Sequence, residues 1–193
     1  MNEMMMNRIC MVFIPILMLL GCGTSTPTFY TLSAMGSGPT GGGLGIGVGP
    51  VILAEYLNRQ NLMVKTSENQ IEASANHLWA GDLRHSVSRV ISVNLGSELN
   101  TGNVRSYPWR GDGEIDYQVT MDIHEFVAAN DGYAHLHASW RVFAMPERRL
   151  VSSETFVARE PVKETTFEAM IAAQSRLLAR FSNVIADCIR KHQ

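Results

Sequence analysis

The chain is poor in the residues on which several kinds of protein chemistry depend. Its 193 residues include three cysteines, Cys10, Cys22 and Cys188, and their spacing allows no zinc site built from cysteines. Sixteen Lys and Arg face 18 Asp and Glu, so the net charge of −2 gives no electrostatic basis for binding nucleic acid. There is no G-x-S-x-G elbow and no thiol with a candidate base beside it, which leaves nucleophilic catalysis without support.

The apolar run from Ile9 to Leu20 is too short to remain in a bilayer as a spanning helix. Twelve helical residues cover about 18 Å, whereas the hydrocarbon core is about 30 Å thick. Its length, and the basic Arg8 just before it, are typical of the apolar region of a secretory signal peptide.

The sequence Leu-Leu-Gly-Cys at 19–22 ends this run and resembles a bacterial lipobox, in which the cysteine is lipidated and becomes the new N-terminus. An ordinary signal peptide with an incidental Cys22 is the alternative. The Gly, Ser and Thr residues that follow Cys22 favour lipidation, and two or more acyl chains anchor a protein stably. We therefore predict a lipoprotein signal peptide at 1–21, a lipidated cysteine and short linker at 22–28, and a single domain at 29–193.

Two residues bear on the cellular compartment and on disulfide formation: Gly23 and Cys188. Gly23 stands where lipoproteins of the inner membrane typically carry Asp, so we expect an outer-membrane anchor with the domain facing the periplasm. Once Cys10 leaves with the signal peptide and Cys22 carries lipid, Cys188 is the only free thiol and no intrachain disulfide can form. Apart from the covalent lipid on Cys22, we expect no cofactor.

The first part of the predicted domain contains two strands joined by an irregular segment. Aromatic and β-branched residues predict a short strand at 29–32, and the many Gly, Ser and Pro residues at 34–45 predict a flexible loop. The following GLGIGVGPVIL lacks the G-x-G-x-x-G spacing and the lysine of nucleotide-binding loops. We interpret Ile46 to Leu53 as a strand, with an edge or a bulge at Pro50, because proline cannot donate to a neighbouring strand.

A helical turn, a hairpin and a helix are predicted next. One turn is expected at 54–57, and two short strands at 62–66 and 70–74 flank a turn. From Leu78 to about Leu99 apolar residues recur every three or four positions, which predicts an amphipathic helix with Trp79 as a core anchor near its start. The apolar stripe of this helix comprises Leu83, Val87, Val90, Ile91 and Leu95.

In the second half of the sequence, residue patterns predict a three-stranded meander followed by a long helix. Apolar residues alternate from Ile115 to Ile123 and from Ala134 to Val142, and Asn-Asp-Gly at 130–132 between them is a strong hairpin signal. A third strand is expected at 150–158 and a helix at 166–190. The inner stripe of that helix is expected to comprise Phe167, Met170, Ile171, Leu177, Leu178, Phe181, Val184, Ile185 and Cys188. Together these elements predict an α+β fold, a mostly antiparallel sheet with two amphipathic helices packed on one face.

Polar residues on the predicted sheet suggest two candidate cation sites. His135 and His137 share one strand face, and His124 lies on the polar face of the partner strand, so a shared zinc is one interpretation. The solvated face of an antiparallel sheet explains these histidines more simply. Similarly, the acidic run of Asp112, Glu114 and Asp116 is better explained as a solvated turn than as a cation site.

The segment from Ile46 to Leu95 resembles the ABC-type transport auxiliary lipoproteins, the PqiC-like family. The matching pattern is x-V-G-P-V-x-L, then x-Y-L-x-R, N-x-I, and a Trp-Ala pair that opens a helix. The FYTL sequence at 29–32, shortly after the lipobox, fits as well. The chain departs from the pattern at Ala54 and Gln60, where prolines are expected, and at His77, where Arg is common.

The resemblance implies a non-enzymatic, lipid-anchored subunit of a transport system. Such proteins work with an MCE-domain protein that bridges the periplasm and with an inner-membrane component, moving lipid or other hydrophobic molecules between membranes. The candidate partner-binding residues are Val48, Gly49, Pro50, Tyr56, Leu57 and Arg59. Ordinary turn and core chemistry explains the same motif equally well. A homo-oligomer would suit a docking platform. The alternatives are a metal-binding or hydrolytic lipoprotein that uses the three histidines, and a structural envelope lipoprotein.

Overall fold

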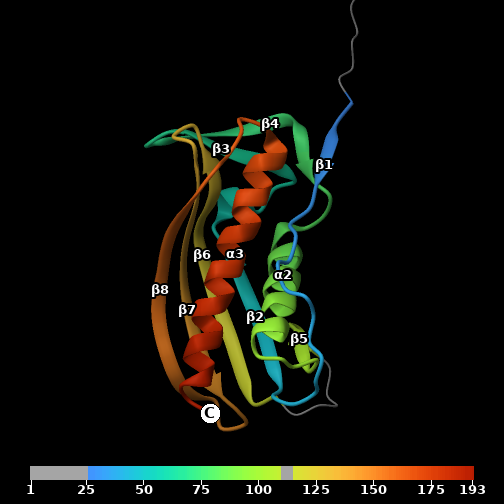
Figure 1. The fold of residues 1–193 in the computed structure, drawn as a ribbon. Helices are drawn as coiled ribbons and strands as arrows, with labels where there is room; N and C mark the ends of the chain where they lie inside the picture. The colour runs from blue at the N-terminus through green and yellow to red at the C-terminus, as the bar shows by residue number, and fades with distance from the viewer. Residues whose placement is uncertain (1–25, 110–114) are drawn as a thin grey trace, which may run out of the picture.

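The computed structural model describes residues 26–109 and 115–193. These residues form one eight-stranded sheet with two helices on one face, as Figure 1 shows. Antiparallel pairing dominates the sheet, so the predicted α+β class is confirmed. No helix in the described part of the chain has the length and apolar character needed to cross a bilayer.

The largest part of the sheet is a meander of β6 (Tyr117–Ala129), β7 (Tyr133–Ala144) and β8 (Arg149–Pro161). The predicted hairpin joins β6 to β7, and its Gly132 has a φ of +83°, a conformation that glycine adopts easily. The pairing of β6 with β7 shifts register between Ile123 and Glu125. Because of this shift, Phe126 and Ala128 take over the buried positions that odd-numbered residues hold earlier in β6.

Two separate arms of the sheet start from the other edge of β6. One arm consists of β2 (Ile46–Leu53), which pairs in parallel with the first half of β6, and β5 (Val104–Ser106) beyond it. The other arm begins with β3 (Asn61–Ser67), which pairs with the last residues of β6. It continues to β4 (Gln70–Trp79) and β1 (Thr28–Tyr30). The predicted helical turn between the arms is the 3₁₀ helix η2 (Glu55–Leu57).

The two helices cover the same face of the sheet (Figure 1). The helix α2 (Leu83–Glu98) begins after Asp82, whose side chain accepts a hydrogen bond from the His85 N–H, and its predicted apolar stripe is buried. The helix α3 (Phe167–Arg190) begins after Thr166, whose hydroxyl accepts from the Ala169 N–H.

Three predictions about these elements are wrong in detail. The first helix starts at Leu83 instead of Leu78, because Trp79 still belongs to the sheet and donates its N–H to the Gln60 carbonyl at 2.7 Å. Consequently β4 extends five residues beyond the predicted end at Ser74. Trp79 is nevertheless a core residue. On α3, Val184 lies outside the buried stripe and is 38% exposed.

The glycine-rich segment at 34–45 forms no helix or strand, as predicted, and lies along α2. The Met35 N–H donates to Asn94 Oδ1 at 2.9 Å, and the Thr40 N–H donates to Asn100 Oδ1 at 3.1 Å. A Cβ on Gly36 would lie 2.5 Å from the Cβ of Ser97, so this close approach to the helix requires glycine.

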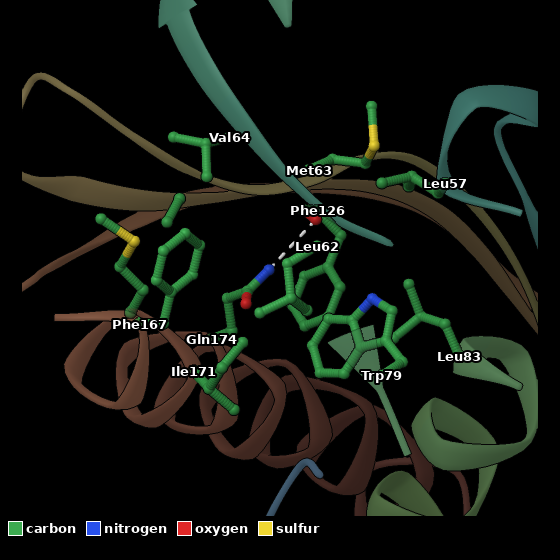
Figure 2. Close-up of a pocket in the computed structure, with 12 residues that line it drawn as sticks. Leu57, Leu62, Met63, Val64, Trp79, Leu83, Phe126, Phe167, Ile171 and Gln174 are labelled. Atoms are coloured by element: carbon green, nitrogen blue, oxygen red, sulfur yellow. Dashed lines mark hydrogen bonds between the residues drawn. The ribbon is translucent and has the colours of Figure 1, made fainter. Parts of the chain in front are cut away.

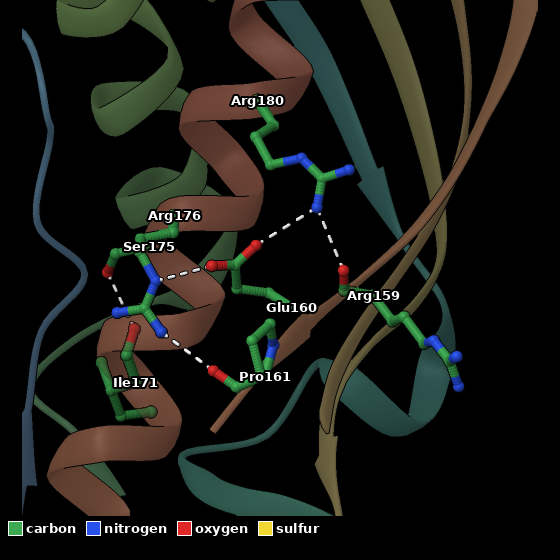
Figure 3. Close-up of polar contacts among 7 residues, drawn as sticks. All are labelled: Arg159, Glu160, Pro161, Ile171, Ser175, Arg176 and Arg180. Carbon is green, nitrogen blue, oxygen red and sulfur yellow. Dashed lines mark hydrogen bonds and ion pairs between the residues drawn. The ribbon is translucent and has the colours of Figure 1, made fainter. Parts of the chain in front are cut away.

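Polar contacts attach the end of β8 to α3, as Figure 3 shows. The carboxylate of Glu160 accepts from Arg176 Nε at 2.8 Å and from Arg180 Nη1 at 3.2 Å. The same two arginines also donate to the backbone carbonyls of Pro161 and Arg159. Because β8 pairs only with β7 in the described sheet, this cluster ties an edge strand to the helix layer.

Candidate functional site

A surface groove of about 450 Å³ lies beside the Gly49–Pro50 peptide, and we call it the β2 groove. Its walls come from three parts of the chain: residues 49–53 of β2, the side chains of Arg84, His85 and Ser88 on α2, and Tyr107 and Pro108 after β5. Its volume falls within the range of about 300–1,000 Å³ that is typical of ligand sites.

The floor of the β2 groove is an irregular part of β2. The pairing of β2 with β6 shifts register between Val48 and Val51, so Pro50 marks a bulge, one of the two predicted alternatives. Gly49 has a φ of +121°, and its carbonyl accepts a hydrogen bond from Gln118 Nε2 at 2.9 Å. A Cβ on Gly49 would lie 2.6 Å from the Cβ of Tyr107, so glycine also permits the close approach of the chain after β5.

Two basic side chains, Arg84 and His85, line the β2 groove. Arg84 and His85 lie in the first turn of α2, where the helix dipole adds partial positive charge. Arg84 donates to Asn58 Oδ1 at 3.2 Å, and His85 Nδ1 lies 3.7 Å from the capping carboxylate of Asp82. No Asp or Glu is among the described residues that line the groove.

A buried hydroxyl lies at the same groove. Ser88 is 6% exposed, and its Oγ has no hydrogen-bond partner within the described structure. An unpaired polar atom in such a position costs about 1–3 kcal/mol of stability.

The structure places the six predicted partner-binding residues at different depths. Val48 and Leu57 are 0% and 2% exposed, so both belong to the core and neither lines the groove. Pro50 lines the groove, and Arg59 is exposed on the turn after η2, in an adjoining depression. Tyr56 donates to the His124 carbonyl at 3.2 Å, and burial, with a smaller effect of Glu125, raises its pKa to about 12.

Sequence reasoning missed the five groove residues that lie outside β2: Arg84, His85, Ser88, Tyr107 and Pro108. They lie about 30–60 positions after Gly49–Pro50, a distance over which sequence pattern carries no contact information. Only the packing of α2 over β2, and the return of the chain through β5, bring them together.

The structure divides the three candidate histidines into two locations. The rings of His124 and His137 lie 4.9 Å apart, but His135 Nε2 instead contacts Asp131 Oδ2 at 2.9 Å. His124 Nε2 lies 2.9 Å from Ser139 Oγ. Across residues 26–109 and 115–193, no three His, Cys, Asp or Glu side chains form a group that could hold a metal ion.

Other predicted residues lie in the core or outside the described chain. Cys188 is buried on α3, as predicted, and burial raises the pKa of its thiol. Asp116 accepts a hydrogen bond from the Gly45 N–H at 2.6 Å, which gives it a structural role. Cys22, Asp112 and Glu114 lie outside the described residues.

A second pocket, shown in Figure 2, lies inside the molecule between the β3–β4 arm and α3. Its walls are mainly apolar, and its amide, Gln174 Nε2, is already paired with the Phe126 carbonyl at 3.1 Å. The pocket has room for about 10 Å³, whereas a single water needs about 10–15 Å³. In this arrangement it has no space for an acyl chain, and the β2 groove is the better candidate site.

Comparison with known proteins gives one family match. The model of the family described as "ABC-type transport auxiliary lipoprotein component" matches residues 30–186. No curated protein sequence matches the chain significantly.

Solved structures share the fold at low sequence identity. A crystal structure described only as an uncharacterized protein matches with a TM-score of 0.72 and 19% identity, covering 86% of this chain and 99% of its own. Protein XCC0632 from Xanthomonas campestris, described as DUF330, matches with a TM-score of 0.68 and 16% identity, covering 86% and 98%. A PelC dodecamer from Paraburkholderia phytofirmans matches more weakly, with a TM-score of 0.45 and 13% identity over 80% and 93%.

Proposed function

Because this chain belongs to the family of ABC-type transport auxiliary lipoprotein components, we propose that it is an outer-membrane lipoprotein that faces the periplasm and serves an MCE-type transport system. The match over residues 30–186 is the observation that carries this proposal. The lipobox-like sequence at 19–22 and the Gly that follows it support the anchor and its location. The cargo would be lipid or another hydrophobic molecule.

The proposed role within that system is docking without catalysis. The interior pocket has room for about 10 Å³, which is too little for an acyl chain. The β2 groove instead offers an open surface of about 450 Å³ with basic side chains on its wall. These features favour a subunit that holds a partner over one that carries the cargo itself.

The proposed partners are an MCE-domain protein that spans the periplasm and an inner-membrane transport component. In this proposal the anchor would hold the chain at the outer-membrane end of that bridge, where the chain would bind the tip of the MCE protein. Assembly into a homo-oligomer would repeat the β2 groove around that tip.

Crosslinking in intact envelopes, followed by capture of the lipidated chain, tests the proposal. We expect an MCE-domain protein to be recovered with the wild-type chain and to be strongly depleted when the bait is Cys22→Ala, which lacks the anchor. A Lys163→Glu bait, altered on an exposed loop away from the groove, should recover the partner as wild type does. Absence of any MCE-domain protein, with intact wild-type bait in the outer membrane, would overturn the proposal.

A further inference from the structure

Half of one edge of β2 has no strand beside it. The short strand β5 pairs with β2 only at Ile46 to Val48, and within the described chain no strand follows it along Val51 to Leu53. The last backbone contact on this side is the Tyr107 N–H to the Val48 carbonyl at 2.8 Å. The next residue, Pro108, has no N–H with which to continue the ladder.

The backbone groups of Val51 and Leu53 face this open edge. Ala54 donates its N–H toward β6, to the Ile123 carbonyl at 2.9 Å. Along a strand the hydrogen-bonding direction alternates from residue to residue, so Ile52 also faces β6, whereas Val51 and Leu53 face the other way. Their N–H and C=O groups therefore point into the β2 groove.

The groove begins where the pairing of β5 with β2 ends, and the first turns of α2 form its other wall. Three residues of open edge span about 10 Å at roughly 3.3 Å per residue, which suits a short extended segment. Unpaired strand edges are templates for pairing with another chain, and peptide recognition by strand addition uses them.

The side chains above this edge indicate what kind of segment fits. Arg84 and His85 supply basic groups, and the α2 N-terminus adds positive potential. The lining itself contains no carboxylate, and the nearest described one, Asp82, lies 3.7 Å from His85 Nδ1, which leaves Arg84 as the main partner for an acidic group. On the opposite side of the edge, Ile52 and Tyr107 are 56% and 52% exposed and can pack against apolar side chains.

We propose that the β2 groove binds an extended, acidic peptide segment of a partner protein, which adds to β2 as a strand in line with β5. Its backbone pairs with Val51 and Leu53, and an Asp or Glu side chain meets Arg84 and His85. The inference deepens the proposed docking role and rests on it for the identity of the partner. Peptide binding itself can be measured on the purified chain alone.

Selection from a phage-displayed library of random dodecapeptides, on the full chain in detergent, tests the inference. We expect enriched peptides to alternate β-branched or aromatic residues with at least one Asp or Glu. Synthetic copies should bind at least tenfold more weakly to Arg84→Glu than to wild type. The matched charge reversal Lys163→Glu should bind within twofold of wild type, because Lys163 lies outside the groove.

Two further measurements separate strand addition from a general effect of charge. Saturation with peptide should slow amide exchange at Val51 and Leu53 at least tenfold, while Ile52, whose N–H faces β6, is already slow. Ser88→Ala should leave peptide binding within twofold of wild type while the free protein unfolds at the same or a higher temperature, since the hydroxyl is buried and makes no bond within the described structure.

The inference is overturned if no peptide is enriched, if enriched peptides lack acidic residues, or if binding is insensitive to Arg84→Glu. Exchange at Val51 and Leu53 that peptide leaves unchanged would also overturn it. Peptide binding without recovery of an MCE-domain protein in envelopes would refute the proposed transport role but leave the groove as a peptide site. Recovery of that protein without peptide binding would do the reverse.

Discussion

At the scale of single residues, Gly49 carries the most demanding backbone conformation beside the groove. Its φ is +121°, and an added Cβ would lie 2.6 Å from the Cβ of Tyr107. We expect Gly49→Ala to lower the free energy of unfolding by about 1–3 kcal/mol, because both the backbone and the contact become strained. Denaturant unfolding measures the change. Gly42→Ala, at an open position without positive φ, is the control and should change stability by less than about 0.5 kcal/mol.

Tyr56 should make stability depend on alkaline pH. Burial raises its pKa from 10.0 to about 12, so the folded state favours the neutral phenol more than the unfolded state does. The stability from this group is therefore fully present below the unfolded pKa of 10.0 and is lost as pH rises to about 12. We expect Tyr56→Phe to flatten the stability profile between these pH values and to remove the phenolate absorbance that titrates near 12. An unchanged titration in the variant would assign the shifted group to another of the five tyrosines.

At the scale of elements, the attachment of β8 to α3 depends on one carboxylate. Glu160 forms ion pairs with both Arg176 and Arg180, and its side chain is 17% exposed. We expect Glu160→Gln to lower stability by about 1 kcal/mol, since it removes charge from hydrogen bonds that are only partly screened by solvent. Amide exchange should accelerate in β8 more than in β6.

The exposed Glu164, on the loop just beyond β8, supplies the matched control. Glu164→Gln makes the same chemical change without an ion pair in the structure and should leave both stability and exchange near wild type. Equal effects of the two substitutions would show that the Glu160 cluster contributes nothing specific.

Local patterns in the sequence were sufficient to predict most elements. Alternation identified β6 and β7, and the Asn-Asp-Gly turn identified their hairpin. The start of α2 was wrong because periodicity alone does not separate the end of an apolar strand, here Trp79, from a helix that begins after the Asp82 cap. The parallel pairing of β2 and β3 with β6 could not be predicted, because it joins segments far apart in the chain.

The candidate site was predictable only in part for the same reason. The Gly49–Pro50 motif marked one wall of the groove, since its residues are adjacent in sequence and irregular for a strand. Arg84, His85 and Tyr107 carry no local signal of a shared location. These residues lie close together only because α2 packs above β2, which is a property of the whole fold.

At the scale of the whole molecule, one cysteine is expected to decide where the protein resides. If Cys22 carries the lipid, Cys22→Ala removes the anchor, and we expect nearly all of the chain to move from the membrane fraction to the soluble periplasmic fraction. Fractionation and immunoblotting measure the change. Cys188→Ala is the control, because its thiol is buried in the core and the variant should stay with the membrane. Membrane retention of Cys22→Ala would refute the lipid anchor.

The attachment of two arms to one edge of β6 has a consequence for the order of folding. In synthesis, β2 precedes its partner β6 by about 70 residues, whereas the β6–β7 hairpin closes over a three-residue turn. The β6–β7 hairpin can therefore form as soon as both strands are made, whereas β2, with its apolar side chains, has no partner strand until β6 has been synthesised. During that interval the N-terminal half is the part of the chain most exposed to wrong pairing. Incomplete chains in which β6 has not yet been made should accordingly be the ones that need protection by a chaperone.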